Sequence, residues 1–224
     1  MSTAPVLIGR GLSKRYGDVV AIDGVDIEVW RGSSLALTGP SGSGKTTLLH
    51  VLAGIISPDS GSVVLDGRRI DDMDDRIRTK LRSRHFGFVF QEGYLVPELT
   101  ALENVALPLL LQRQERRTAF ESARRWFEPL GIDGLEGRRP GELSGGQAQR
   151  VAIARAIVMG PSVVFADEPT AALDSESTHR TMEMLEQVTK YADAGLVVVT
   201  HDPAVAERCD RQIGILDGRI GMAA

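Results

Sequence analysis

Short apolar runs alternate along the chain with longer segments in which apolar residues recur at a helical spacing. Four of the runs predict buried strands, at Ser34 to Thr38, Phe86 to Phe90, Val163 to Ala166 and Leu196 to Thr200. Strands that alternate with helices are typical of an α/β fold, because a helix is the usual connection between parallel strands. The pattern therefore predicts an α/β fold with a mainly parallel sheet.

The first part of the chain has a different pattern. Val25 to Trp30 and Ser62 to Leu65 predict short strands, and the Asp66–Gly67 pair that follows is a strong signal for a hairpin turn. We therefore expect a small N-terminal antiparallel β layer beside the α/β core. A second pair of this kind, Asp217–Gly218, predicts another hairpin near the end of the chain.

Between about residues 92 and 160 the pattern is helical. Thr100 and Glu103 form a capping box that opens one helix, and the charged segment Arg113 to Phe127 predicts a second one. We expect an inserted α-helical subdomain over about 92–160, with the α/β core made of about 1–91 and 161–224 in a single domain. The basic run Arg76 to Arg84 is typical of a solvated helix face, the alternative being a contact with lipid or a membrane partner.

Composition and charge narrow the classes of function. The chain has 26 basic and 30 acidic residues and a net charge of −4, so it lacks the basic footprint of a nucleic-acid partner. Apolar runs such as Val105 to Leu111 are far shorter than the roughly 20 residues that span a bilayer. The N-terminus has no secretory signal, and the single Cys209 fits a reducing compartment. We expect a cytosolic protein that needs a partner for any role at a membrane.

A phosphate-binding loop is predicted at residues 39–46, which match G-x-x-x-x-G-K-[ST] between a strand and a helix. The glycines let backbone N–H groups approach phosphates, and the helix N-terminus adds a positive dipole. Lys45 would reach the β- and γ-phosphates, and the Thr46 hydroxyl would bind Mg²⁺. The residues expected to bind the nucleotide here are Gly39, Ser41, Gly42, Ser43, Gly44, Lys45, Thr46 and Thr47. The alternative is a glycine-rich turn without a ligand.

Three polar residues follow buried strands at the edge where open α/β sheets bind ligands. After the strand at Val163 to Ala166, Asp167 is expected to hold Mg²⁺ through its water shell, and Glu168 to polarise the attacking water as a general base. An Asp–Glu pair that only caps the next helix is the alternative, which the phosphate-binding loop disfavours. His201 ends another strand on the same edge, so we expect it near the γ-phosphate.

These motifs still allow a kinase, a GTPase or a helicase-like motor. The run Leu143, Ser144, Gly145, Gly146, Gln147, with Gln149 and Arg150 following, resembles the signature motif of the ATP-binding cassette (ABC) family. It lies between the phosphate-binding loop and the strand acids, and its glycines open a second helix N-terminus suited to a phosphate. The resemblance covers nearly the whole chain and implies an ATPase with a P-loop NTPase core.

The resemblance implies roles for three further residues. Tyr16 stands where these ATPases place an aromatic ring that stacks on adenine, with an ordinary core aromatic as the alternative. Gln91 resembles the glutamine that reaches Mg²⁺ and the attacking water and links them to the membrane partner. Ala171 to Asp174 resembles the loop that crosses the dimer interface, and Asp174 is also a suitable helix N-cap.

Partners follow from the same resemblance. In this family two cassettes close head-to-tail over two ATP molecules, so Lys45 and Glu168 of one protomer would face Ser144 and Gly146 of the other. The resemblance implies a second copy of the chain, ATP with Mg²⁺, and a separate integral membrane permease. The permease would hold the ATPase at the cytoplasmic face of the cell membrane.

Residues 94–109, which end in Leu107-Pro108-Leu109, are similar to the lipoprotein-releasing and macrolide-exporter ATPases of bacteria. This similarity favours an exporter or a lipoprotein-releasing system. Polar amino-acid importers share much of the segment, so an importer remains an alternative. Another is an ATPase that transmits force to a membrane protein controlling cell-wall enzymes. A soluble cassette of DNA repair or translation is disfavoured, because such proteins usually carry large insertions or two cassettes.

Overall fold

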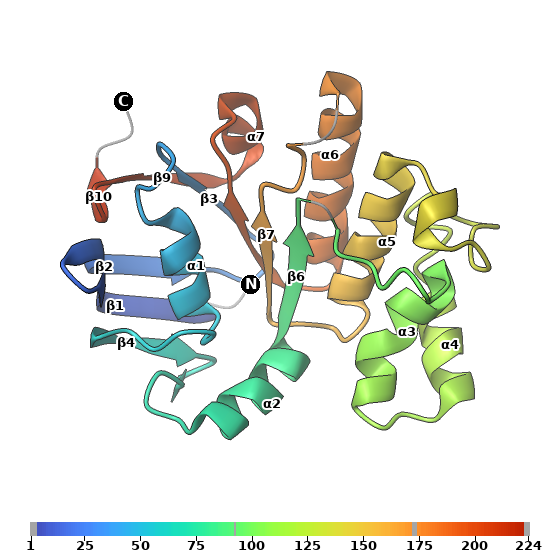
Figure 1. Cartoon of the computed structure of the whole chain (residues 1–224), viewed down its shortest axis with the longest axis horizontal. Helices are drawn as coiled ribbons and strands as arrows, with labels where there is room; N and C mark the ends of the chain where they lie inside the picture. The colour runs from blue at the N-terminus through green and yellow to red at the C-terminus, as the bar shows by residue number, and fades with distance from the viewer. Residues whose placement is uncertain (1–3, 92, 172–173, 222–224) are drawn as a thin grey trace.

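The computed structural model describes residues 4–91, 93–171 and 174–221 (Figure 1). One antiparallel sheet contains β1 (Leu7–Tyr16), β2 (Val19–Val29), β4 (Ser60–Leu65) and β5 (Arg68–Arg69), in the order β2-β1-β4-β5. A second sheet contains β3 (Ser34–Thr38), β6 (Phe86–Phe90), β7 (Val163–Asp167), β8 (Gly195–Val199), β9 (Arg211–Leu216) and β10 (Arg219–Gly221), in the order β10-β9-β3-β8-β7-β6. Its pairs are parallel except β9 with β10, so the expected α/β core and N-terminal antiparallel layer are confirmed.

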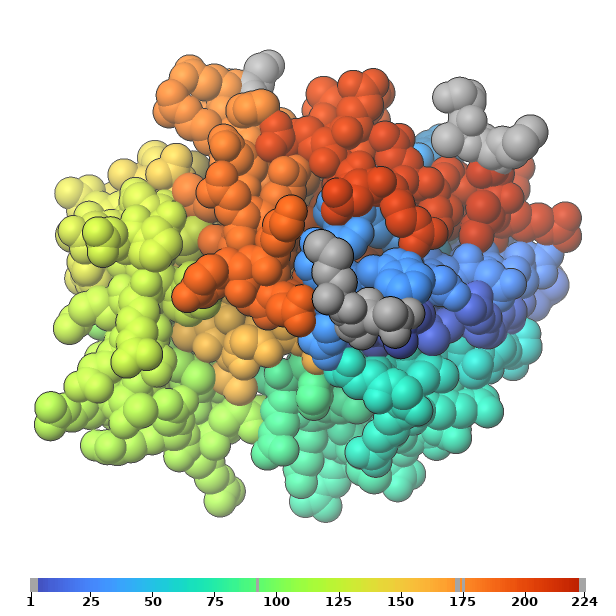
Figure 2. Space-filling model, turned by 180° about the vertical axis from the view of Figure 1, so that it is seen from behind, coloured from blue at the N-terminus to red at the C-terminus, as the bar shows by residue number. Residues whose placement is uncertain are grey.

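The helices are α1 (Lys45–Leu52), α2 (Asp75–His85), α3 (Ala101–Leu111), α4 (Arg116–Arg124), α5 (Gly145–Ile157), α6 (Ser175–Tyr191) and α7 (Pro203–Arg208), with a 3-10 helix η1 at Pro140–Glu142. In Figure 1 the antiparallel sheet lies on the left and α3, α4 and α5 lie on the right. Figure 2 shows the same division from behind, with the yellow-green helical region and the blue N-terminal sheet at opposite ends. No helix in the described part of the chain has the length and apolar character that crossing a bilayer requires.

Both faces of the second sheet are buried, which explains the uninterrupted apolar runs of its strands. One face, which includes Leu37 and Phe165, packs against α1 and the antiparallel sheet. The other face, which includes Ala36 and Val164, packs against α3, α4, α5 and α6. Because α5 contacts both β6 and α6, the helical region shares its core with the sheet. Glu92, where this region was expected to begin, lies outside the described residues.

The two hairpin turns were predicted correctly from the sequence, but the bounds of one helix were not. Asp66–Gly67 and Asp217–Gly218 have positive φ at both residues, as the predicted two-residue hairpins require. The helix expected over Arg113 to Phe127 is wrong in its bounds. Arg113 has a left-handed φ of 63°, which an α-helix cannot include. At the other end the chain leaves the helix in tight turns, and the Phe127 amide bonds to the Arg124 carbonyl at 3.0 Å.

Candidate nucleotide-binding site

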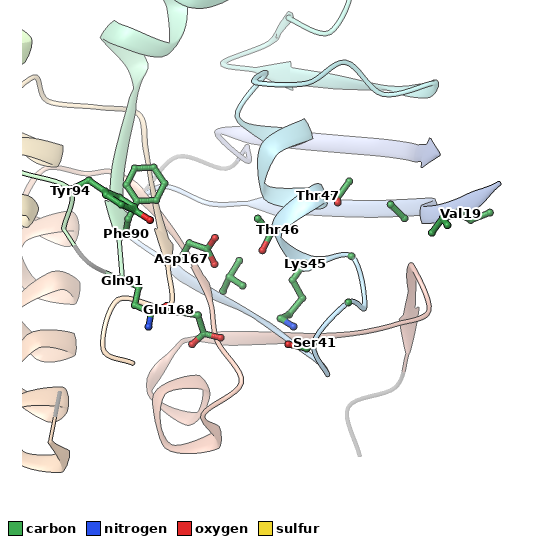
Figure 3. A pocket seen from close by; sticks show the side chains of 15 residues that line it. Val19, Ser41, Lys45, Thr46, Thr47, Phe90, Gln91, Tyr94, Asp167 and Glu168 are labelled. Atoms are coloured by element: carbon green, nitrogen blue, oxygen red, sulfur yellow. The ribbon is translucent and has the colours of Figure 1, made fainter. Parts of the chain in front are cut away.

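A cavity of about 470 Å³ lies at the carboxyl edge of the parallel strands (Figure 3). Parallel order places the segments after β3, β7 and β8 at this one edge, because β8 lies between β3 and β7. Figure 3 shows Ser41 and Lys45 on one side of the cavity and Gln91 on the other, with Asp167 and Glu168 between them. The volume of this cavity lies in the range of small-molecule binding sites. Residues far apart in the sequence are therefore brought together as predicted.

The loop after β3 has the shape expected of a phosphate cradle. Gly39 and Gly44 have φ of 140° and 104°, and a Cβ on either would lie 2.1 Å from a backbone carbonyl oxygen, of Ile215 and Ala21 respectively. Only glycine fits these two positions. The cavity wall includes Ser41, Gly42, Gly44, Lys45, Thr46 and Thr47. Gly39 and the buried Ser43 support the loop from outside that wall.

Lys45 is nearly buried, at 8% exposure, at the first position of α1. Its Nζ donates to the carbonyl oxygens of Gly39 and Pro40, both at 2.8 Å. An ammonium group has three N–H donors, so these two bonds leave one donor. The loop thus holds a cation within the cavity wall, beside the first amides of a helix. Both features attract an anion such as phosphate.

Thr46 and Asp167 provide two oxygen groups at one point of the cavity. Burial, followed by the neighbouring Glu168 charge, raises the pKa of the Asp167 carboxyl group. The charges of His50 and Lys45 and a hydrogen bond with the Thr46 side chain oppose this rise and have the smaller effect. No group of three or more His, Cys, Asp or Glu side chains among the described residues forms a metal site. A hydroxyl and a carboxylate fit Mg²⁺ that also binds phosphate and water.

Glu168 follows β7 in an unusual conformation. Its φ is 47°, which non-glycine residues rarely adopt, and its amide donates to the Val199 carbonyl at 2.9 Å. Its carboxylate accepts a hydrogen bond from Nδ1 of His201 at 2.6 Å, so Nδ1 carries a proton. Residues held in such backbone regions are concentrated at functional sites. The structure brings both predicted residues together: Glu168 lines the nucleotide cavity, whereas His201 lines only a neighbouring cavity that Glu168 shares.

The signature run lies elsewhere. Ser144 caps α5 and forms a reciprocal capping box with Gln147. Leu143 packs against the helical core. A second cavity, of about 490 Å³, is lined by Gly131, Ser144, Gly145, Gly146, Gln147, Arg150, Asp174 and Ser177 and shares no residue with the first. Within one chain, the signature and the phosphate-binding loop are therefore not brought together.

Asp174 lies beside the signature at the start of α6. Its Oδ1 accepts from the Ser177 amide at 2.9 Å, which confirms the predicted N-cap. This backbone hydrogen bond is the main cause that lowers the pKa of Asp174. Its proximity to Ser144 in the second cavity is consistent with an interface role, which stays a prediction. Ala172 and Leu173 of the same loop lie outside the described residues.

The cavity wall expected to contain Tyr16 differs in detail from the expectation. Tyr16 is half exposed opposite Val19 in the β1–β2 pair, with the Lys14 ammonium 6.0 Å from its ring centre, and it is not part of the cavity wall. Val19 and Val20 form the wall there, and Tyr94 forms the wall near Gln91. Sequence reasoning gave these three no site role, because none belongs to a nucleotide-binding motif. Adenine stacking on Tyr16 stays a prediction.

Comparison with known proteins identifies the family. The family model described as "ABC transporter" matches residues 22–171. The chain belongs to the ABC transporter family. It is 42% identical over 97% of its length to the lipoprotein-releasing system ATP-binding protein LolD of Bordetella pertussis, of which it covers 96%. It is also 41% identical to LolD 2 of Caulobacter vibrioides, over 96% of both chains.

Solved structures of ABC cassettes share this fold. One is the dimeric ATP-binding cassette MJ0796 bound to ADP and Pi, with a TM-score of 0.85 and 36% identity over 96% of both chains. Another is cbiO1 of Clostridium perfringens, part of the ABC transporter complex cbiONQ. Its TM-score is 0.90 and its identity 29%, over 98% of this chain and 88% of the other. The resemblance to ABC ATPases that the signature run indicated is therefore confirmed.

The contact between Glu168 and His201 predicts a pH dependence in this ABC cassette. The hydrogen bond to Glu168, and then its charge, raise the pKa of His201. The pair therefore stabilises the folded state fully below about pH 6.5, the ordinary histidine pKa, and this contribution is lost as pH rises through the raised value. In NMR titrations we expect the His201 midpoint to lie above 6.5 and to fall toward 6.5 in Glu168→Gln. The His85 and His179 signals serve as internal controls, and an unchanged His201 midpoint would contradict the contact.

Proposed function

We propose that the chain binds ATP with Mg²⁺ and hydrolyses it to ADP and phosphate. The observation that carries the proposal is the position of Glu168, whose carboxylate is held by His201 at the edge of the cavity that contains Lys45. The backbone amides of the loop and the Lys45 ammonium would bind the β- and γ-phosphates. Mg²⁺, held by the Thr46 hydroxyl and by Asp167 through water, would neutralise phosphate charge.

In the proposed reaction, Gln91 orients a water molecule and Glu168 takes its proton as the water oxygen attacks the γ-phosphorus. The bond between that phosphorus and the β,γ-bridging oxygen breaks, and ADP leaves with the bridging oxygen. His201 holds the Glu168 carboxylate in place through the 2.6 Å hydrogen bond. Lys45 stabilises the negative charge on the transferred group.

We propose that two copies of the chain act together. Within one chain the phosphate-binding cavity contains a lysine and two acids, whereas the signature cavity contains a helix N-terminus and no lysine. A head-to-tail dimer would place each signature cavity over the γ-phosphate bound by the partner. The solved relative described as a dimer with ADP and Pi supports this proposal.

A permease is the proposed membrane partner, and an apolar groove of about 450 Å³ is its proposed docking site. The groove lies between α2, β6, α3 and α5 and includes Phe86, Phe88, Leu107, Pro108 and the 73% exposed Leu111. Phe90 lies in the walls of both the groove and the nucleotide cavity, directly before Gln91. Movement at one cavity can therefore be transmitted to the other. The LolD names of the relatives favour a lipoprotein-releasing system.

Capture from native membranes tests the partner. With Glu168→Gln and Mg-ATP, we expect mass spectrometry to identify a permease with few membrane spans and a large extracytoplasmic domain. Adding Leu111→Asp should remove the permease, because a buried unpaired charge opposes docking in an apolar groove. Tyr191→Asp, at a residue 85% exposed outside the groove, is the control and should retain the permease. A many-span permease with a solute-binding protein would instead show an importer, and a cell-wall regulator would show force transmission.

A further inference from the structure

Gln149 is a buried polar residue that the proposed reaction does not use. It lies in the second turn of α5 and is 4% exposed. Its Nε2 donates to the carbonyl oxygen of Pro169 at 2.8 Å and to that of Phe90 at 3.2 Å. An amide nitrogen has two N–H groups, so backbone carbonyls from two different segments use both donors.

The two carbonyls belong to the neighbours of the proposed catalytic residues. Phe90 directly precedes Gln91, and Pro169 directly follows Glu168. The bond to Pro169 is buried and the bond to Phe90 is partly buried, and an electrostatic contact is stronger in such surroundings than on the surface. One side chain of α5 therefore holds the backbone next to both residues that would act on the attacking water.

Arg155 attaches the same segment to α5 at a second point. Its guanidinium donates to the carbonyl oxygens of Gly93 at 2.6 Å and Tyr94 at 2.8 Å. Gly93 lies against the helix, since a Cβ there would be 3.4 Å from the Ala152 Cβ. The backbone on both sides of Gln91 is therefore bonded to α5.

We propose that Gln149 is a positioning residue that couples the two ATP sites of the dimer. The inference rests on the proposed function. The first residues of α5, Ser144 to Gly146, would contact the ATP bound by the partner. Gln149, one turn further along the same helix, holds the segments that act on the chain's own ATP. When the partner's ATP draws in the start of α5, Gln149 moves the backbone at Phe90 and Pro169 with it. Hydrolysis at one site then depends on occupancy of the other.

Gln149→Met tests the coupling, because methionine has a similar length and is readily buried but lacks the two donors. We expect kcat to fall about tenfold, the effect of losing one to two hydrogen bonds in the transition state. The Hill coefficient for ATP should fall from between 1 and 2 toward 1. The Kd for ATP should stay unchanged, because Gln149 is not part of the nucleotide cavity wall. Gln149→Glu presents oxygen to both carbonyls and should lower kcat further.

The control is Gln187→Met, on the exposed side of α6, which should leave kcat and the Hill coefficient unchanged. Wild-type kcat and Hill coefficient in a folded Gln149→Met variant would overturn this inference and leave the proposed function intact. So would a lower melting temperature with both kinetic values unchanged, because Gln149 would then have a structural role only. A wild-type chain that hydrolyses no ATP would overturn the proposed function, and the inference with it.

Discussion

Glu168→Gln is expected to leave ATP binding intact and to lower ATP turnover by at least about 100-fold, the usual contribution of a general base. Glutamine fills the same space but cannot take a proton from water. Because the γ-phosphate then stays in place, Mg-ATP should hold two copies together, and size-exclusion chromatography should show a stable dimer. Turnover is measured as phosphate release, and ATP affinity by titration with a fluorescent nucleotide.

The matched control is Glu183→Gln, which makes the same change at an exposed position of α6 and should have wild-type turnover. Wild-type turnover in Glu168→Gln would assign the base to another residue. Loss of ATP affinity in this variant would instead show that Glu168 supports the binding site. Without the permease the basal turnover can be low even in the wild type. The decisive quantity is then the ratio of the turnover of Glu168→Gln to that of the wild type.

The site-bearing part of the fold could be predicted because its signals are local. Buried strands such as β3 and β6 are apolar on both faces, so their bounds are visible in the sequence, and the structure begins and ends both where expected. The phosphate-binding loop is a contiguous motif, and its glycines at positions 39 and 44 have positive φ, although the carbonyl oxygens that leave no room for a Cβ there belong to the distant Ile215 and Ala21. Parallel strand order then brings the residues after β7 and β8 to the same edge.

Other elements depend on contacts that a sequence pattern does not record. Strand β1 (Leu7–Tyr16) was not predicted, because register shifts against β2 interrupt the alternation of buried and exposed residues. In the basic run on α2, Arg76, Lys80 and Arg84 are exposed, as expected of a solvated face. Arg78 and Arg82 are instead partly buried and bond to the Ser57 hydroxyl and the Gly54 carbonyl. Both partners lie in the segment after α1.

The position of Gln149 illustrates the same limit within the site. Its residue type and its place after the signature run are visible in the sequence, but its partners at Phe90 and Pro169 are backbone carbonyls about 60 and 20 positions away. Carbonyls are present at every residue and leave no compositional signal. Motifs therefore locate groups that contact a ligand, whereas residues that hold those groups in place emerge only from the fold.

Lys45→Ala is expected to weaken ATP binding itself, by roughly 10- to 100-fold, because hydrogen bonds from a charged donor to phosphate are lost. Turnover should fall with it, and added Mg-ATP should no longer produce the dimer of Glu168→Gln in the double variant. Isothermal titration measures the affinity. The substitution also removes the bonds from Nζ to the Gly39 and Pro40 carbonyls, so a thermal melt must show that the chain is folded.

Lys80→Ala is the control for Lys45→Ala, since Lys80 is an exposed cation on α2 outside the nucleotide cavity and its loss should leave ATP affinity unchanged. Equal losses in both variants would mean that ATP responds to overall charge rather than to the loop. Wild-type affinity in folded Lys45→Ala would contradict the phosphate role of Lys45 and leave the backbone amides as the main ligands. A selective loss in Lys45→Ala, combined with retained affinity in Glu168→Gln, would separate binding from hydrolysis within one cavity. That separation is what distinguishes a site that uses ATP from one that only holds it.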